Sequence, residues 1–118
     1  MNTNRVIIAG SRSAVYSDGI KEKVTFLLNG LTDVEIVSGT ARGADKIGER
    51  IAEELGLPLK RFPADWDKHG RSAGPIRNRQ MAEYGTHLIL IWDGVSKGSK
   101  NMLEEARKRG LHTRVIII

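Results

Sequence analysis

The chain has 118 residues with no cysteine, and its 19 Lys and Arg against 14 Asp and Glu give a formal net charge of +5. This length suits one domain that buries roughly two thirds of its unfolded surface, and the lack of cysteine excludes disulfides, thiolate metal sites and cysteine nucleophiles. Because no segment reads as a signal peptide or a long apolar run, we expect a cytoplasmic protein without membrane contact, whose positive charge favours anionic partners.

The first half of the chain alternates strand and helix twice. Residues 5–9 and 34–37 are short runs rich in Val and Ile, typical of parallel strands covered on both faces. Apolar residues recur with a 3.6-residue period over 20–31 and again over 44–55, where Gly56 supplies a stop. Two strand-helix units are therefore predicted.

The middle of the chain changes in character. Residues 57–62 contain Pro58, which cannot donate to a sheet ladder, so this segment is predicted to be an edge strand. The long connection 63–74 contains Trp66, His69, small residues and several charges, and its length predicts a binding loop over the carboxyl edge of the sheet. Proline suits the first position of a helix, which predicts a third helix over 75–85.

The last third completes the pattern with a buried strand over 87–92, a helix over 99–109 and a terminal strand over 113–118. This order predicts an α/β fold, a single Rossmann-like three-layer domain over residues 1–118 with a mainly parallel five-stranded sheet. Ligands of such sheets bind beyond the carboxyl ends of the strands, near the point where strand order reverses.

Small, hydroxylated and cationic residues follow three of the predicted strands. Glycine lets backbone N–H groups approach a ligand, a following helix points its positive end at the same spot, and Arg or Lys balances the charge. The sequence therefore predicts phosphate-binding turns at this edge. The residues are Gly10, Ser11 and Arg12, then Ser38, Gly39, Thr40, Arg42, Gly43, Ala44 and Asp45, then Asp93, Gly94, Ser96, Lys97, Gly98 and Ser99.

The turn containing Gly39 and Gly43 is the strongest of these signals, because the two glycines flank a hydroxyl and a guanidinium where a strand must become a helix. It has neither the Gly-Lys-Ser/Thr ending of a Walker A loop nor the Gly-x-Gly-x-x-Gly spacing of dinucleotide-binding folds. Triphosphate hydrolysis and ordinary NAD chemistry are therefore disfavoured. The alternative is structural, since any tight strand-to-helix turn needs glycine and a cap; for the turn at Gly10 the two explanations are nearly balanced.

Several cations fall where a helix dipole disfavours them. Arg77 and Arg79 lie in the first turn of the predicted third helix, and Lys97 lies at the start of the fourth. Together with Arg12 and Arg42 they are expected to converge on one anion-binding edge. The alternative is that each points into water or pairs with a nearby carboxylate.

Two tryptophans stand beside carboxylates at strand ends. Asp65 with Trp66, and Trp92 with Asp93, are able to stack a base and to bond a ribose or an exocyclic amine. The alternative is that each tryptophan belongs to the core. The three histidines lack ligand-like spacing, so no metal site is predicted.

Taken in order, these stretches resemble the YspA/YpsA-related branch of the SLOG superfamily, which carries the domain of unknown function DUF2493. The resemblance runs from about residue 5 to residue 110. It implies a Rossmann-like fold that binds nucleotides or nucleotide-derived ligands, often as a sensor. The stretches are GSR (10–12), SGTARGAD (38–45), DW (65–66), AGPIRNRQM (73–81), WDG (92–94) and SKGS (96–99).

Related SLOG enzymes, the cytokinin-activating phosphoribohydrolases, cleave a nucleotide N-glycosidic bond with a Gly-Gly-x-Gly-Thr stretch followed closely by paired glutamates. The corresponding turn here is 97–102, KGSKNM, and Glu104 and Glu105 lie further along the chain. This departure favours binding over hydrolysis.

Three functional hypotheses follow. The first is a module that binds or senses a phosphorylated, nucleotide-like ligand, in which Asp45, Asp65, Asn78 and Asp93 orient sugar or base and Arg79 assists the phosphate turns. The second is a nucleotide N-glycosidase with Asp45, Asp93 or Glu104 as the candidate catalytic carboxylate. The third is single-stranded nucleic-acid binding, based on the net charge and on the superfamily's more distant likeness to DprA-type proteins.

The remaining expectations concern partners. No cofactor is implied beyond the nucleotide-like ligand itself. The apolar segment 115–118 falls at a predicted sheet edge, which favours a homo-oligomer without indicating its stoichiometry.

Overall fold

The computed structural model describes residues 3–118. Its centre is a five-stranded sheet with the order β3-β2-β1-β4-β5, in which every pairing is parallel. The α/β, Rossmann-like prediction is confirmed, and the sheet is parallel throughout. The strands are β1 (Asn4–Gly10), β2 (Val34–Ser38), β3 (Leu59–Arg61), β4 (His87–Trp92) and β5 (His112–Ile117).

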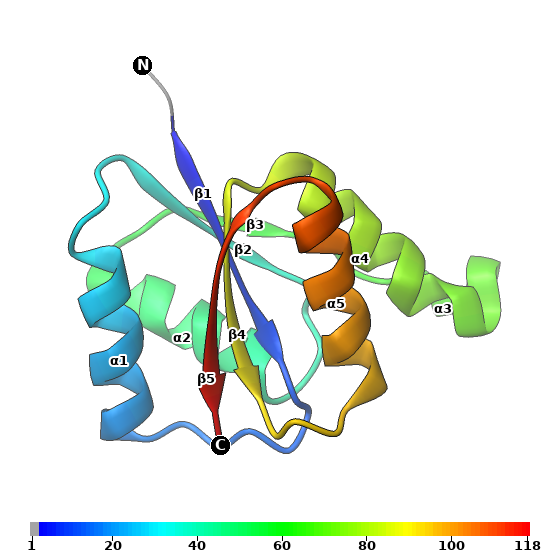
Figure 1. The fold of residues 1–118 in the computed structure, drawn as a ribbon, viewed down its shortest axis with the longest axis horizontal. Helices are drawn as coiled ribbons and strands as arrows, with labels where there is room; N and C mark the ends of the chain where they lie inside the picture. Colours follow the sequence, from blue (N-terminus) through cyan, green and yellow to red (C-terminus); the bar gives the residue numbers. More distant parts are fainter. Residues whose placement is uncertain (1–2) are drawn as a thin grey trace.

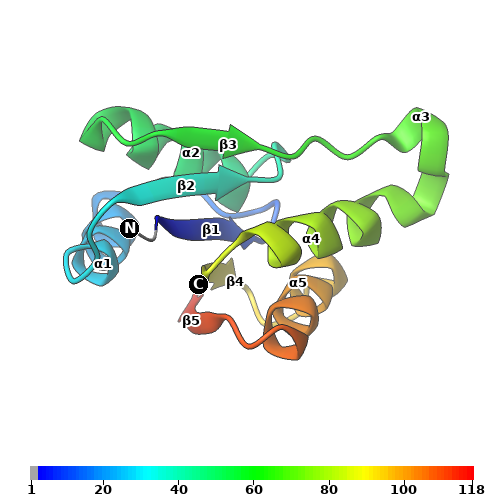
Figure 2. The same cartoon turned by 90° about the horizontal axis from the view of Figure 1, so that it is seen from above.

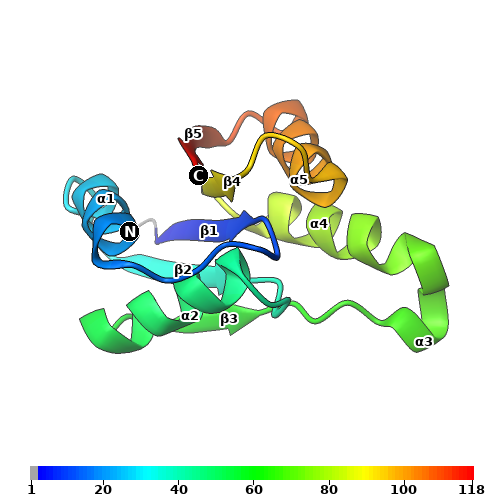
Figure 3. The same ribbon diagram turned by 90° about the horizontal axis from the view of Figure 1, so that it is seen from below.

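Helices cover both faces of the sheet. In Figure 1, α1 and α2 lie to the left of the strands and α4 and α5 to the right. Figures 2 and 3 show α3 at the far end of α4, beyond the carboxyl ends of the strands. The helices are α1 (Asp18–Leu28), α2 (Ala44–Leu55), α3 (Trp66–His69), α4 (Ala73–Tyr84) and α5 (Lys97–Lys108), with a 3-10 turn at Gly70–Ser72.

The two faces of the sheet support two separate cores. Because side chains alternate along a strand, Val6 and Ile8 of β1 pack under α1 and α2, whereas Ile7 packs under α4 and α5. This two-sided burial is why the central strands are continuous apolar runs rather than alternating ones. No helix within residues 3–118 is long and apolar enough to span a membrane.

The prediction that residues 63–74 form a loop was wrong. Most of this segment is helical, since α3 and the 3-10 turn occupy it and α4 already begins at Ala73. Asp65 starts α3 by accepting a hydrogen bond from the Lys68 amide at 3.1 Å. Pro75 is the third residue of α4 rather than the first, a position that tolerates proline because amides of the first turn have no partner within the helix.

Several other boundaries differ from the prediction, with α1 ending at Leu28 rather than at residue 31, and two of the differences have a clear cause. The edge strand β3 has three residues, because Leu57 instead closes the end of α2 by donating its amide to the Ala52 carbonyl at 2.8 Å. Helix α5 begins at Lys97, two residues before the predicted start, because Ser96 takes the N-cap position. Both differences arise from capping contacts, which apolar periodicity does not report.

Candidate ligand-binding site

A cavity of about 420 Å³ opens at the carboxyl edge of the sheet, where β1 and β4 lie side by side. This is the point where the strand order reverses, because the chain leaves β1 toward β2 and returns beyond it to β4. The loop after β1 contributes Gly10 and Arg12, the loop after β4 contributes Asp93, and helix α4 contributes Arg77.

A second cavity, of about 470 Å³, adjoins the first on the side of β2. Gly39, Thr40 and Arg42 line it, and both cavities share Arg12, Ala41, Trp66 and Arg77. Each volume falls in the range of small-molecule sites. The shared residues form a boundary that is cationic and aromatic, and Arg12 holds its guanidinium carbon 6.0 Å from the centre of the Trp66 ring.

Ser11 joins three loops beneath these cavities. Its amide donates to the Ile91 carbonyl at 2.9 Å, its carbonyl accepts from the Ala44 amide at 3.1 Å, and its hydroxyl accepts from the Asp93 amide at 3.0 Å. The side chain is fully buried, so Ser11 positions the loops after β1 and β4 and the start of α2 relative to one another.

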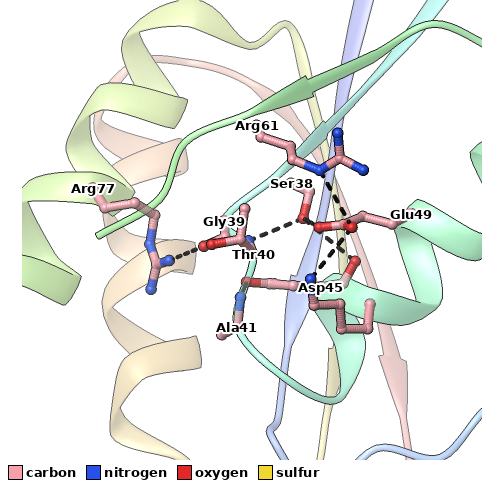
Figure 4. A network of polar contacts seen from close by, with 9 residues as sticks. Ser38, Gly39, Thr40, Ala41, Asp45, Glu49, Arg61 and Arg77 are labelled. Atoms are coloured by element: carbon pink, nitrogen blue, oxygen red, sulfur yellow. Dashed lines mark hydrogen bonds and ion pairs between the residues drawn. The ribbon is translucent and has the colours of Figure 1, made fainter. Parts of the chain in front are cut away.

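Ser38 has a comparable role at the end of β2, as Figure 4 shows. Its hydroxyl donates to the Glu49 carboxylate at 2.7 Å and accepts from the Thr40 amide at 3.0 Å. Partial burial alone would raise the pKa of Glu49, but the Ser38 hydroxyl and the Lys46 and Arg61 cations lower it on balance. An ionised Glu49 therefore stabilises the turn after β2 through its hydrogen bond with Ser38.

Asp45 is the buried acid of the site. It lies in the first turn of α2, is 5% exposed and accepts a hydrogen bond from the Ala41 amide at 3.0 Å. Burial raises the pKa of Asp45 to about 6, although the Ala41 amide and the Arg77 guanidinium oppose the shift. Of the two carboxyl groups that line the cavity, Asp45 and Asp93, that of Asp45 therefore has the pKa nearer to pH 7.

Arg77 is the buried cation, and it lies in the second turn of α4 rather than in the predicted first turn. Only 8% of it is exposed, and its guanidinium donates to the Gly39 carbonyl (Figure 4). The same guanidinium donates to Asn78 Oδ1 at 3.0 Å. Burial lowers the pKa of Arg77, and Asp45 partly offsets this effect. A Cβ on Gly39 would lie 2.7 Å from Arg77 Nη1 and 2.8 Å from Asp45 Oδ2, so a side chain there would displace one of these two charged groups.

Asp93 is the exposed acid on the opposite wall. Its Oδ1 accepts hydrogen bonds from the Val95 and Ser96 amides, both at 2.9 Å. These bonds, with that of Ser96 the stronger influence, lower the pKa of Asp93. The cavity therefore holds two carboxylates whose pKa values are displaced in opposite directions.

Asn78 connects the two helices behind the cavity. Its amide nitrogen donates to Asn101 Oδ1 at 2.9 Å and to the Gly98 carbonyl at 3.3 Å, while its oxygen accepts from Arg77. These contacts use much of its hydrogen-bonding capacity within the protein. Asn78 therefore anchors α4 to the start of α5 as well as lining the cavity.

The structure gathers only part of the predicted site. The predicted residues that line either cavity are Gly10, Arg12, Gly39, Thr40, Arg42, Asp45, Trp66, Asn78, Asp93, Ser96, Gly98 and Ser99. Those that line neither cavity are Ser11, Ser38, Gly43, Ala44, Asp65, Arg79, Gly94, Lys97 and Glu104. Arg79, Lys97 and Glu104 lie exposed on their helices, and the described residues include no cluster of three or more His, Asp or Glu suited to a metal ion.

Some lining residues were not predicted from the sequence. Ser13, Ala41, Gly74 and Met81 line the cavities but were not among the predicted site residues. Gly74 lies against the ring of Trp66, since a Cβ there would be 3.5 Å from its Cη2 atom. Glycine has no side chain, which permits this close approach of α4 to Trp66.

Comparison with known proteins relates the chain to two proteins in particular. It is 33% identical to the Gene 61 protein of Mycobacterium phage D29 over 117 residues, which cover 91% of each chain. It also superposes with a TM-score of 0.73 on DNA processing protein A (DprA) from Streptococcus pneumoniae, with 20% identity and 96% of this chain covered. The chain corresponds to 50% of that DprA chain, and at this identity the likeness concerns the fold.

The family comparison agrees with the motifs. The model of the YspA, cpYpsA-related SLOG family matches residues 4–69, which contain β1, β2, β3 and the turn that joins β2 to α2. The phage relative extends the similarity over most of the remaining chain. This protein belongs to the YspA, cpYpsA-related SLOG family.

Proposed function

We propose that this protein binds a nucleotide or a nucleotide-derived phosphorylated ligand at the carboxyl edge of its sheet. The observation that carries the proposal is the shared boundary of the two cavities, where the Arg12 guanidinium lies 6.0 Å from the ring of Trp66. Trp66 is 49% exposed, unusually open for a large aromatic side chain beside a cavity. A cation and an open aromatic face are the groups that a phosphate and a base require.

Each part of such a ligand has a partner in the cavity. Arg12, which lines both cavities, offers positive charge to phosphate. Trp66 offers a stacking surface to the base, and the Asp93 carboxylate offers an acceptor to sugar hydroxyls. Buried Arg77 adds a fixed positive charge behind the site without leaving its contact with Gly39.

Arg12→Ala is expected to weaken nucleotide binding by roughly 10- to 100-fold, because charge-assisted hydrogen bonds to phosphate are lost. Arg79→Ala is the matched control, since Arg79 is an exposed arginine that lines neither cavity. Isothermal titration calorimetry measures both variants. Equal losses in both would mean that the overall charge, rather than this site, attracts the ligand.

The ligand itself is identified by mass spectrometry of small molecules released from denatured protein, followed by thermal shifts with nucleoside mono-, di- and triphosphates, ADP-ribose and cyclic nucleotides. An intact nucleotide that raises the melting temperature supports the proposal. DprA is named for DNA processing, so a single-stranded oligonucleotide is included at rising salt. Binding of the oligonucleotide alone, or of nothing, contradicts the proposal.

Trp66→Ala is expected to reduce affinity for a nucleotide by about tenfold or more, because base stacking on an aromatic side chain is lost. Affinity for inorganic pyrophosphate should stay unchanged, because that anion has no base. Titration of both ligands into both proteins separates stacking from phosphate binding. A parallel loss for both ligands would place Trp66 in the fold of the site instead.

A nucleotide N-glycosidase is the second candidate, favoured by one specific observation. Asp45 and Asp93 line the same cavity, and the pKa is raised for the first and lowered for the second. Opposed shifts of this kind are typical of acid and base pairs. Release of free base from a nucleoside monophosphate, abolished in Asp45→Asn with nucleotide binding retained, would establish hydrolysis; an intact nucleotide after long incubation excludes it for that substrate.

A further inference from the structure

The two edges of the sheet differ in how they are protected. The edge strand β3 has three residues, carries Lys60 and Arg61, and lies between Pro58 and Pro63. Short length, charge and flanking proline are the usual means of preventing strands of other molecules from pairing with an edge. This edge is therefore closed to further strand pairing.

The edge strand β5 has only one of these protections, the charge of Arg114. It has six residues without proline or lysine, and Val115 and Ile117 are 39% and 64% exposed. The His112 amide donates to the Thr86 carbonyl at 3.2 Å, and the Ile118 amide donates to the Trp92 carbonyl at 3.0 Å. In a parallel ladder the residues that bond to the neighbouring strand alternate, so the backbone groups of 113, 115 and 117 point outward from the sheet.

An apolar groove of about 480 Å³ lies beside this open edge, between α1 and β5. Phe26 lines it and is 76% exposed. The rim of the groove carries both signs of charge, with Glu22 and Lys23 on α1 and Arg114 on β5. A second copy of the same surface therefore offers a cation to each acid and an aromatic ring to each groove.

We propose that a second copy of this chain covers the open edge, and that the two β5 strands pair in antiparallel fashion about a two-fold axis at Val115. In this register Val115 pairs with its own counterpart, and Thr113 pairs with Ile117 of the other copy. All three residues with outward backbone groups then exchange hydrogen bonds with a partner. The result is a continuous ten-stranded sheet, counted as two sheets of five strands.

The packing around the junction follows from the symmetry. A two-fold axis perpendicular to the sheet keeps each face on its own side, so the two α1 helices meet over the junction and each Phe26 lies toward the groove of the other copy. The carboxyl edges of the two sheets then point in opposite directions. The inference is therefore independent of what the cavities bind.

Sedimentation equilibrium over the micromolar range tests the association. The wild-type chain is expected to form a dimer, and Val115→Lys is expected to raise its dissociation constant by about tenfold or more, because two lysines meet at the axis. Leu55→Lys is the matched control, since Leu55 at the end of α2 is 38% exposed, against 39% for Val115. If circular dichroism shows that Val115→Lys does not fold, Phe26→Lys on α1 tests the same dimer interface.

Cysteine cross-linking tests the register, because the chain has no cysteine of its own. Val115→Cys is expected to form a disulfide-linked dimer under mild oxidant, since paired Cα atoms at the axis lie about 5.5 Å apart. Ile117→Cys should not, because four residues of offset place its two copies about 13 Å apart. A monomer throughout, a dimer that persists in folded Val115→Lys or Phe26→Lys, or equal cross-linking by both cysteine variants would each overturn the proposal.

Discussion

Replacing Gly43 with alanine is expected to lower the free energy of unfolding by about 3–5 kcal/mol, a large part of the stability of a domain this size. Gly43 precedes α2 with φ of +79°, and a Cβ there would lie 2.3 Å from the Ser11 carbonyl oxygen and 2.5 Å from that of Arg12. Those atoms are backbone, so they cannot move aside as a flexible side chain can. The loop after β1 would separate from the start of α2.

Urea unfolding followed by circular dichroism measures this effect, and Gly30→Ala is the matched control. Gly30 lies on the surface after α1, and a Cβ there would have nothing within 4 Å, so its replacement should change stability little. If both variants were equally stable, the close approach of the β1 loop to α2 would not hold in solution. The result also shows how far the glycines of this turn serve packing rather than ligand contact.

The stability of the wild-type protein relative to Asp45→Asn is expected to fall by about 2–3 kcal/mol between pH 4 and pH 7. Burial raises the pKa of Asp45 to about 6 in the folded state. The folded protein therefore binds a proton that the unfolded chain, with an ordinary carboxyl, has already released. This contribution is present in full below the unfolded pKa and is lost as the pH rises through about 6.

The measurement compares urea unfolding of both proteins across this pH range. Groups common to both proteins cancel in the difference, including Glu49 and Asp93, whose lowered pKa values act in the opposite direction. The asparagine can still accept the Ala41 hydrogen bond, so local geometry is preserved. A difference that does not change with pH would show that Asp45 is not buried as a proton-binding group.

Much of the fold was predictable from local patterns. Apolar runs at 5–9, 34–37 and 87–92 indicated the three central strands, and periodic segments identified α1 and α2, because both signals report burial of the nearest neighbours in the sequence. Parallel strands place their carboxyl ends at one edge. The sequence could therefore also indicate where the candidate site lies.

Individual side chains at that edge were less predictable, and α4 shows why. Arg77 and Asn78 are buried while Arg79 is exposed, a distribution that follows the helical period of 3.6 once the start of the helix is known. The helix was predicted to begin at residue 75, whereas it begins at Ala73. Each residue of the first two turns therefore lies two positions further into the helix than predicted. The same uncertainty affected α5, where Lys97 and Glu104 lie on the exposed side.

The sequence by itself therefore determined the order of the elements, the parallel sheet, and the gathering of glycine, hydroxyl and cationic residues at one edge. The tertiary structure alone decided that Asp45 and Arg77 are buried beside Gly39, and that Trp66 returns over the cavity on α3. The physical reason is one of range. Strand and helix patterns arise from neighbours a few residues apart, whereas the burial of a charge depends on which distant segments pack around it.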